Sequence, residues 1–335
     1  MINKKNTIKT IIITSPILII TTVILSILYG AKSIDFYTVW NAFFHYDQEN
    51  VDHAIIITSR LPRVLGALLV GALLAISGAI MQGMTRNYLA SPSIMGVTDG
   101  SAFVITLCMV FIPSPTPLEL IIFSMLGSAL GASIVFGFGF FLHHGLSPVR
   151  LAIIGTVIGS FLSGISAAIA SYFQISQNIS FWYHARLHQM DIASIEFGLW
   201  FGLIGILIAL IISKSITILS LGEDISTTLG QRTTLVKGMA MLAVILLTGT
   251  AVALVGKIGF VGLIIPHITR YLVGVDYKWI IPCTGIIGGV FLALCDVLSR
   301  FVNYPFETPI GVVTSMIGIP FFLYLIRIKG GKSHD

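Results

Sequence analysis

The sequence predicts an all-α, polytopic membrane protein with about ten transmembrane helices. Composition is the first observation: 56% of the 335 residues are hydrophobic and only 10% are charged, against about 25% charged residues in a typical soluble domain. The second observation is that runs of about 20 apolar residues, enough to cross a bilayer core of about 30 Å, recur along the whole chain with short polar breaks. These runs leave no room for a separate soluble domain, so we expect residues 1–335 to form a single transmembrane domain.

The apolar runs define the expected spans and their topology. The spans cover about residues 9–29, 64–84, 93–112, 118–141, 150–172, 195–214, 238–256, 258–273, 279–300 and 309–327. An even number of spans puts both termini on one side, which we take as cytoplasmic because most of the 19 Lys and Arg residues then lie inside. The exceptions on the outer side are Lys32, Arg60, Arg63, Arg186, Lys257 and Arg300. The basic residues are scattered at helix ends, so the net charge of +5 indicates membrane topology and not a nucleic-acid partner.

One strongly polar interval, residues 221–237, separates two long apolar spans and faces the cytoplasm in this topology. Glu223 and Asp224 suit a helix N-terminus, where acidic side chains are favourable. Gly230 interrupts the segment, and Lys237 follows the interruption, so the sequence favours two short helices broken at this glycine. The segment is either a solvated connection or a docking surface for another protein.

Three arginines on the outer side depart from the positive-inside trend. Arg60 and Arg63 lie at the outer mouth of the second span, and Arg300 lies at the outer mouth of the ninth. Guanidinium groups pair well with carboxylates, so these residues predict contact with an acidic partner; the alternative is contact with lipid head groups. The two larger outer segments, residues 31–59 and 171–193, offer landing surfaces for such a partner, and a short interfacial helix is expected in the second.

Two acidic residues fall within expected spans, where charge is costly and needs a partner. Asp296 precedes Arg300 by four residues, which is the spacing of an ion pair on one helix face. Asp99 lies near the start of the third span and is expected to face an aqueous cavity. Acids of this kind would also serve a proton-coupled secondary transporter, which is the alternative from a different class.

Neither an enzyme nor a resident cofactor is indicated by the sequence. It contains no complete phosphate-binding loop, so any ATP hydrolysis would belong to another chain. The eight histidines form no HExxH zinc pair, and we expect no metal site. His184 and His188, four residues apart in an outer segment, could contact a metal or the edge of a haem if that segment is helical, but polar residues at an exposed surface are the commoner reason for such a pair.

A set of motifs from about residue 55 onward carries a resemblance to a known family. The motifs are Arg60-Leu-Pro-Arg63, Leu69-Val-Gly-Ala72, Ser77-Gly-Ala79, Gln82, Arg86-Asn87, Leu89-Ala90, Pro92, Gly96-Val97, Leu221-Gly-Glu223, Leu229-Gly230, Gly259-Phe-Val-Gly-Leu263, Pro266-His267, Arg270, Asp296 with Arg300, Pro309-Ile-Gly-Val312 and Gly318-Ile-Pro-Phe-Phe322. On these motifs the chain resembles the FecCD family of ABC-transporter permeases, the membrane subunits of importers for iron-siderophores, haem and cobalamin.

The resemblance implies the fold and the partners. It implies a type II ABC importer permease of ten helices that pairs with a second copy of itself or with a sister permease. Two cytoplasmic ATPase subunits would hold coupling helices at about residues 215–237, and ATP and Mg would bind to those subunits and not to this chain. An extracellular substrate-binding lipoprotein would dock on the outer face.

Individual positions take roles from the same resemblance. Docking of the binding protein is expected at Arg60, Arg63 and Arg300. ATPase coupling is expected at Leu221, Gly222, Glu223, Asp224, Leu229 and Gly230. A cytoplasmic gate is expected at Ser147, Pro148 and Val149.

The implied function is translocation of a ferric siderophore across the cytoplasmic membrane by alternating access, with the coupling helices acting as levers. The outer segment 181–190 is similar to that of ferric-siderophore permeases of Gram-positive bacteria. A haem or cobalamin importer of the same family is the alternative, and His184 with His188 is the feature that keeps haem open.

Overall fold

The structure, a computed structural model, describes residues 4–30, 32–141, 148–304 and 306–330, and the chain in these ranges is built from helices joined by short connections. Each expected span corresponds to one helix. The helices are α1 (Lys4–Leu28), α4 (Leu61–Thr85), α5 (Val97–Phe111), α6 (Pro117–Phe141), α7 (Pro148–Tyr172), α9 (Ile192–Ile211), α12 (Thr233–Val255), α13 (Val261–Val273), α14 (Tyr277–Ser299) and α15 (Ile310–Gly330). The all-helical fold class predicted from composition is therefore confirmed.

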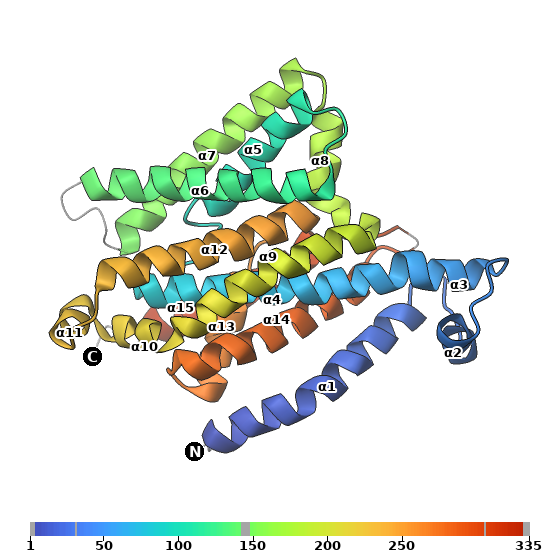
Figure 1. Cartoon of the computed structure of the whole chain (residues 1–335), viewed down its shortest axis with the longest axis horizontal. Coiled ribbons are helices and arrows are strands. Elements are labelled where there is room, and N and C mark those ends of the chain that lie inside the picture. Colours follow the sequence, from blue (N-terminus) through green and yellow to red (C-terminus); the bar gives the residue numbers. More distant parts are fainter. Residues whose placement is uncertain (1–3, 31, 142–147, 305, 331–335) are drawn as a thin grey trace.

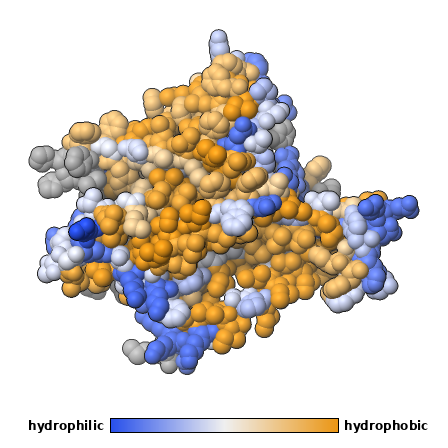
Figure 2. Space-filling model, viewed as in Figure 1, coloured by the Kyte–Doolittle hydropathy of each residue, from blue (hydrophilic) through white to orange (hydrophobic). Residues whose placement is uncertain are grey.

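Length and composition support a membrane location. Within the described ranges, 7 helices are long and apolar enough to cross a bilayer, and α5, α13 and α15 supply shorter apolar stretches. Hydrophobic residues cover most of the middle of the surface in Figure 2, and hydrophilic residues gather toward the two ends, where α11 and the α2–α3 region lie. This pattern is the one expected of a protein whose middle is surrounded by lipid.

Helix α4 is the central element of the bundle. In its most apolar window 78% of the residues are buried, against 22% in the corresponding windows of α1 and α7. Figure 1 shows α4 flanked by α9, α12 and α14, with α1 at one edge and α5, α6, α7 and α8 grouped on the opposite side. The peripheral helices α1 and α7 therefore have broad apolar faces that no other described part of the chain covers.

Small residues allow the central helices to pack backbone against backbone. A Cβ atom on Gly78 of α4 would overlap the carbonyl of Gly262 in α13, and one on Gly262 would lie 2.8 Å from the carbonyl oxygen of Leu74. Gly71 of α4 and Gly288 of α14 meet in the same way. Replacing these glycines would force the helices apart.

Short helices lie at the two ends of the bundle. On one side are α2 (Phe36–Phe44), α3 (Val51–Ile55), the π-helix η1 (Ile56–Arg60), α8 (Ser176–Ala185) and the 3₁₀ helix η2 (Arg186–Gln189). On the other side are α10 (Ser213–Leu221) and α11 (Glu223–Thr228). The short helix predicted within residues 171–193 is confirmed as α8. In Figure 1, α2 and α3 lie at the end opposite α11.

Candidate functional site

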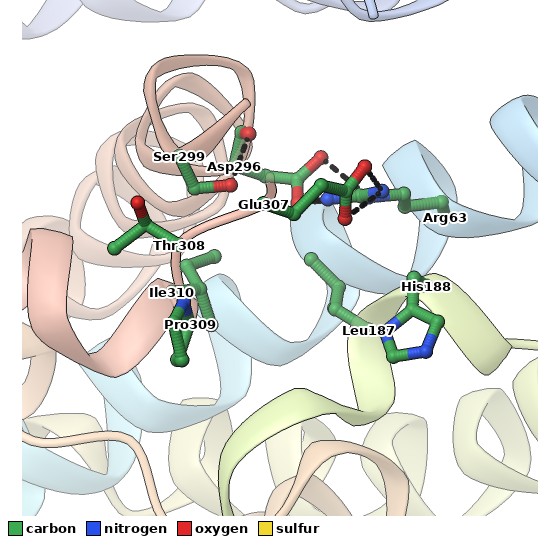
Figure 3. Close-up of a pocket in the computed structure, with 9 residues that line it drawn as sticks. All are labelled: Arg63, Leu187, His188, Asp296, Ser299, Glu307, Thr308, Pro309 and Ile310. Atoms are coloured by element: carbon green, nitrogen blue, oxygen red, sulfur yellow. Dashed lines mark hydrogen bonds and ion pairs between the residues drawn. The ribbon is translucent and has the colours of Figure 1, made fainter. Parts of the chain in front are cut away.

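A network of buried charges joins α4 to the C-terminal end of α14. The Arg63 guanidinium donates to Asp296, with Nε 2.9 Å from Oδ1 and Nη2 2.8 Å from the same oxygen. Its Nη1 donates to Glu307 at 2.8 Å. Figure 3 shows both carboxylates turned toward this one arginine, with Glu307 in the connection between α14 and α15. Arg63 is therefore occupied on two edges by carboxylates of its own chain.

Arg300 completes the network from the other side of Asp296. It forms an ion pair with the Asp296 carboxylate, as the four-residue spacing predicted. Its Nη1 donates to the carbonyl oxygens of Ser26 at 2.7 Å and Tyr29 at 2.8 Å. Asp296 is thus shared between two guanidinium groups, and Arg300 is also tied to the end of α1.

Arg60 is anchored entirely by backbone oxygen atoms of the first helix and the residues after it. Its guanidinium donates to the carbonyls of Ile27, Leu28 and Lys32. Carbonyls at a helix C-terminus lack partners within the helix, and an arginine is well suited to satisfy them. Arg60 and Arg300 therefore hold the C-terminal end of α1 against the bundle.

Burial of these arginines differs from what the sequence suggests. Placed at the mouths of their spans, Arg60, Arg63 and Arg300 would be exposed, yet only 7%, 8% and 3% of their surface is accessible. The physical reason is that internal oxygen acceptors already surround them. Glu307 was not identified from the sequence because it lies 244 positions from Arg63. A role of these arginines in docking stays a prediction.

A small cavity of about 220 Å³ opens beside this network, lined by Arg63, His188, Glu307 and their neighbours. Burial opposes ionisation of Glu307, but the hydrogen bonds and positive charge of Arg63 outweigh that effect and lower the pKa of Glu307. His188 lies at the edge of the same cavity in Figure 3. The side chain of His184 lies outside the described part of the chain, so the structure does not test the predicted pair.

The polar interval at residues 221–237 forms a compact projection at the other end of the bundle. Gly222 (φ +143°) ends α10 and Gly230 (φ +78°) follows α11, both in backbone conformations that favour glycine. Glu223 begins α11 as expected and forms an ion pair with Lys237, with a distance of 2.7 Å between Nζ and Oε1. The prediction of a second short helix after Gly230 was wrong, because the long helix α12 begins at Thr233 and continues through Lys237 without a break.

Exposed leucine and isoleucine side chains give this projection an apolar surface. Leu221, Ile225 and Leu229 are 59%, 49% and 64% exposed although they lie in the most polar part of the chain. Asp224 is exposed beside them. Apolar side chains displayed on a polar projection are typical of protein-interaction surfaces.

The projection also borders a cavity of about 430 Å³ that extends between the helix ends. Glu223 and Lys237 line it together with residues of α4, α6, α7 and α12. Movement of α11 would therefore change the shape of this cavity, and it would act directly on α10 and α12, which α11 contacts. Of the expected gate, Ser147 lies outside the described residues, Pro148 begins α7, and the side chains of Pro148 and Val149 are likewise outside the description.

Asp99 has a partner that the sequence did not reveal. Lys257 Nζ lies 2.6 Å from Asp99 Oδ1, although Lys257 falls in the connection after α12 and was expected on the outer side. The two residues are separated by 158 positions, so no local spacing could indicate the pair.

The bundle of apolar helices, its opposed polar ends and the apolar projection define an integral membrane protein. The chain belongs to the FecCD transport family, whose model matches residues 17–328. It is 60% identical over 326 residues to the iron-uptake system permease protein FeuB of Bacillus subtilis (strain 168), covering 97% of this chain and 98% of that protein. The iron(3+)-hydroxamate import system permease protein FhuB of the same organism is 52% identical over 303 residues, covering 90% of this chain and 79% of that protein.

A solved structure supports the same family at the level of the fold. An inward-facing conformation of a metal-chelate type ABC transporter superposes with a TM-score of 0.81 at 30% identity, covering 95% of this chain and 99% of that one. Family and fold together make the chain a permease subunit of the cell membrane.

Proposed function

We propose that this chain is the membrane-spanning subunit of an ATP-driven importer that carries a ferric siderophore across the cytoplasmic membrane by alternating access. The geometric observation that carries the proposal is the exposed apolar projection at Leu221, Ile225 and Leu229. A projection of this kind would let a nucleotide-hydrolysing partner move the helices. The iron-uptake and iron-hydroxamate functions named for the two Bacillus relatives support the choice of cargo.

The projection is suited to act as a lever because it is fixed to the bundle at two points. Glu223 is paired with Lys237 of α12, and Gln231 Nε2 donates to the carbonyl oxygen of Ser215 in α10 at 3.0 Å. A force on α11 would therefore pass into α10 and α12 together. In this proposal two ATPase subunits bind residues 215–237, and ATP with Mg binds to those subunits.

The remaining assembly follows from the same proposal. A second permease, either an identical copy or a sister chain, covers apolar faces left open on the peripheral helices. Both termini and the projection lie in the cytoplasm, and an extracellular binding lipoprotein delivers the cargo to the opposite end.

The ATPase contact is tested by substituting the apolar surface. L221D and L229D in the assembled transporter should abolish co-purification of the ATPase subunits and uptake of iron. The matched control for co-purification is Tyr37→Asp, because Tyr37 is an exposed aromatic residue of α2 at the opposite end of the bundle. Normal ATPase binding by both leucine variants would refute the proposal. Uptake driven by a proton gradient in vesicles without any ATPase would instead favour a secondary transporter.

Docking at the outer arginines requires a second experiment, because Arg63 is occupied by Glu307. An acidic side chain of the binding lipoprotein would have to compete with this internal carboxylate. E307Q should therefore tighten binding of the lipoprotein to the purified complex, and the change should disappear in 1 M salt. Unchanged or weaker binding would exclude docking at Arg63.

A further inference from the structure

A second cluster of charged and polar groups lies away from both sites described above. Lys257 Nζ is 2.6 Å from Asp99 Oδ1 and 3.0 Å from Ser163 Oγ. Ser163 Oγ in turn donates to Asp99 Oδ1 at 3.1 Å. The three side chains come from α5, α7 and the connection between α12 and α13, so the cluster joins three separate parts of the bundle.

This cluster lies beside the middle of α7, at the first turn of α5 and just after the end of α12. A Cβ atom on Gly159 of α7 would meet the Asp99 carboxylate, which fixes the level of the cluster along that helix. Gly159 lies about 17 Å along α7 from Pro148 at 1.5 Å per residue, and the helix has 25 residues. Ionisable groups at such a depth are costly and are usually functional.

A cavity of about 440 Å³ opens directly beside Lys257. Its walls include Tyr183 on one side and Val312, Ser315 and Met316 of α15 on the other. Among the described residues that line it, Lys257 is the one charged side chain. A mostly apolar cavity with a few fixed polar groups is typical of a binding site for a small molecule.

Lys257 remains accessible from this cavity despite its ion pair. Its side chain is 30% exposed, and that of Asp99 is 21% exposed. The ammonium group also lies 5.1 Å from the centre of the Tyr183 ring. An unpaired ammonium group inside the bundle would carry a large desolvation cost. The carboxylate of Asp99 offsets this cost by pairing with Lys257.

We propose that Lys257 forms a transient binding site for a negatively charged oxygen group of the transported chelate, and that it favours anionic over neutral ferric chelates. This inference rests on the proposed function. The aromatic face of Tyr183 and the apolar wall of α15 would contact the organic part of the chelate, and the ammonium would contact its anionic oxygen.

Neutralisation by Asp99 suits a site through which cargo must pass. A transport site has to bind its cargo well enough to admit it and weakly enough to release it. A free lysine would hold an anionic chelate tightly, whereas a lysine already paired with a carboxylate offers a weaker, directional contact. Removal of each partner should therefore change transport in opposite directions.

The test measures ATP-driven uptake of radioactive iron by the complete transporter in proteoliposomes. The probes are a ferric tris-catecholate, which is anionic, and a ferric tris-hydroxamate, which is neutral. Each variant is compared with the wild type for the same chelate, so that any preference of the binding protein cancels. K257M should raise KM for the tris-catecholate about ten-fold, since hydrogen bonds to charged groups have this strength, and should leave KM for the tris-hydroxamate unchanged.

D99N supplies the opposite perturbation and separates binding from packing. With its charge uncompensated, Lys257 should lower KM for the tris-catecholate and slow its turnover. The matched control is K278M, which removes a lysine that also lies over an aromatic ring, 5.4 Å from the centre of Trp279 at the start of α14, and should change neither KM. A shift of KM in the same direction for K257M and D99N, or equal shifts for both chelates, would overturn the proposal.

Assembly with the ATPase subunits is measured for each variant. If K257M does not assemble, the double variant K257M/D99N, which leaves no unpaired charge, carries the test and should show the same rise in KM. Failure of both to assemble would make the cluster purely structural and would overturn the proposal. Wild-type protein that imports neither chelate would instead refute the cargo assigned under the proposed function.

Discussion

The shared carboxylate of Asp296 offers the sharpest test of the buried charge network. D296N keeps the shape of the side chain but removes its negative charge. Arg63 would then retain Glu307, and Arg300 would retain only neutral oxygen acceptors on and near α1. Two guanidinium groups in a nearly inaccessible site would be compensated by a single, more exposed carboxylate.

The expected loss of stability follows from burial. Asp296 is 1% exposed and Arg300 is 3% exposed, and removal of one partner of a buried ion pair costs about 3–5 kcal/mol. The Lys32–Asp52 pair is a useful comparison because its side chains are 65% and 27% exposed. Exposed pairs contribute less than about 1 kcal/mol, so D52N should change stability far less than D296N.

The free energy of unfolding is measured in detergent micelles by denaturant titration of helical circular dichroism. D296N should unfold at a clearly lower denaturant concentration than the wild type, and D52N should unfold close to the wild type. Double substitution of Asp296 and Arg300 by Asn and Met should recover part of the loss, since it removes the uncompensated charge. Equal midpoints for D296N and D52N would show that burial does not govern the strength of these pairs.

Three further predictions concern packing, acidity and backbone conformation. G78A should destabilise the bundle by about 1–3 kcal/mol, because the added methyl group overlaps a carbonyl. G238A should be tolerated, because nothing lies within 4 Å of its Cβ position. Thermal unfolding of the two variants checks this difference. Burial opposes ionisation of Glu307, but Arg63 lowers the pKa of this carboxylate overall. Glu307 therefore contributes stability above its unfolded-state pKa, and this contribution is lost as the pH falls through the folded-state pKa. E307Q should reduce the loss of stability at acidic pH, which a pH series of unfolding midpoints measures. G230V should lower ATPase binding more than G230N, because asparagine tolerates the positive φ of this position better than a β-branched residue does. The measurement is a pull-down of the ATPase subunits with equal protein loading, and equal binding by both variants would contradict the prediction.

The helices were predictable because their signal is local. Each span is a run of apolar residues, and seven of the described runs are long enough to cross a membrane, so their positions can be obtained without knowledge of any other part of the chain. The Asp296–Arg300 pair was predictable for the same reason, because one helix turn brings the two residues together. Gly230 also marked a true interruption, although the helix after it proved to be the long α12.

Long-range contacts were not predictable from such patterns. Arg63 meets Glu307, and Asp99 meets Lys257, only after distant helices have packed. The connection that carries Lys257 leaves the end of α12 beside Trp182 and Tyr183 of α8, and it leads to α13, which packs against Gly78 of α4. Only this folded path brings Lys257 to Asp99.

The anchoring of α1 has a consequence for how this protein can be trimmed. The helix is largely exposed along its length, so it would be an obvious segment to delete when a shorter version is prepared. Its terminal carbonyl oxygens, however, solvate Arg60 and Arg300 in place of water. A chain shortened before residue 30 would leave both cations without these acceptors in apolar surroundings, so the first helix is required for the stability of the region around the two arginines.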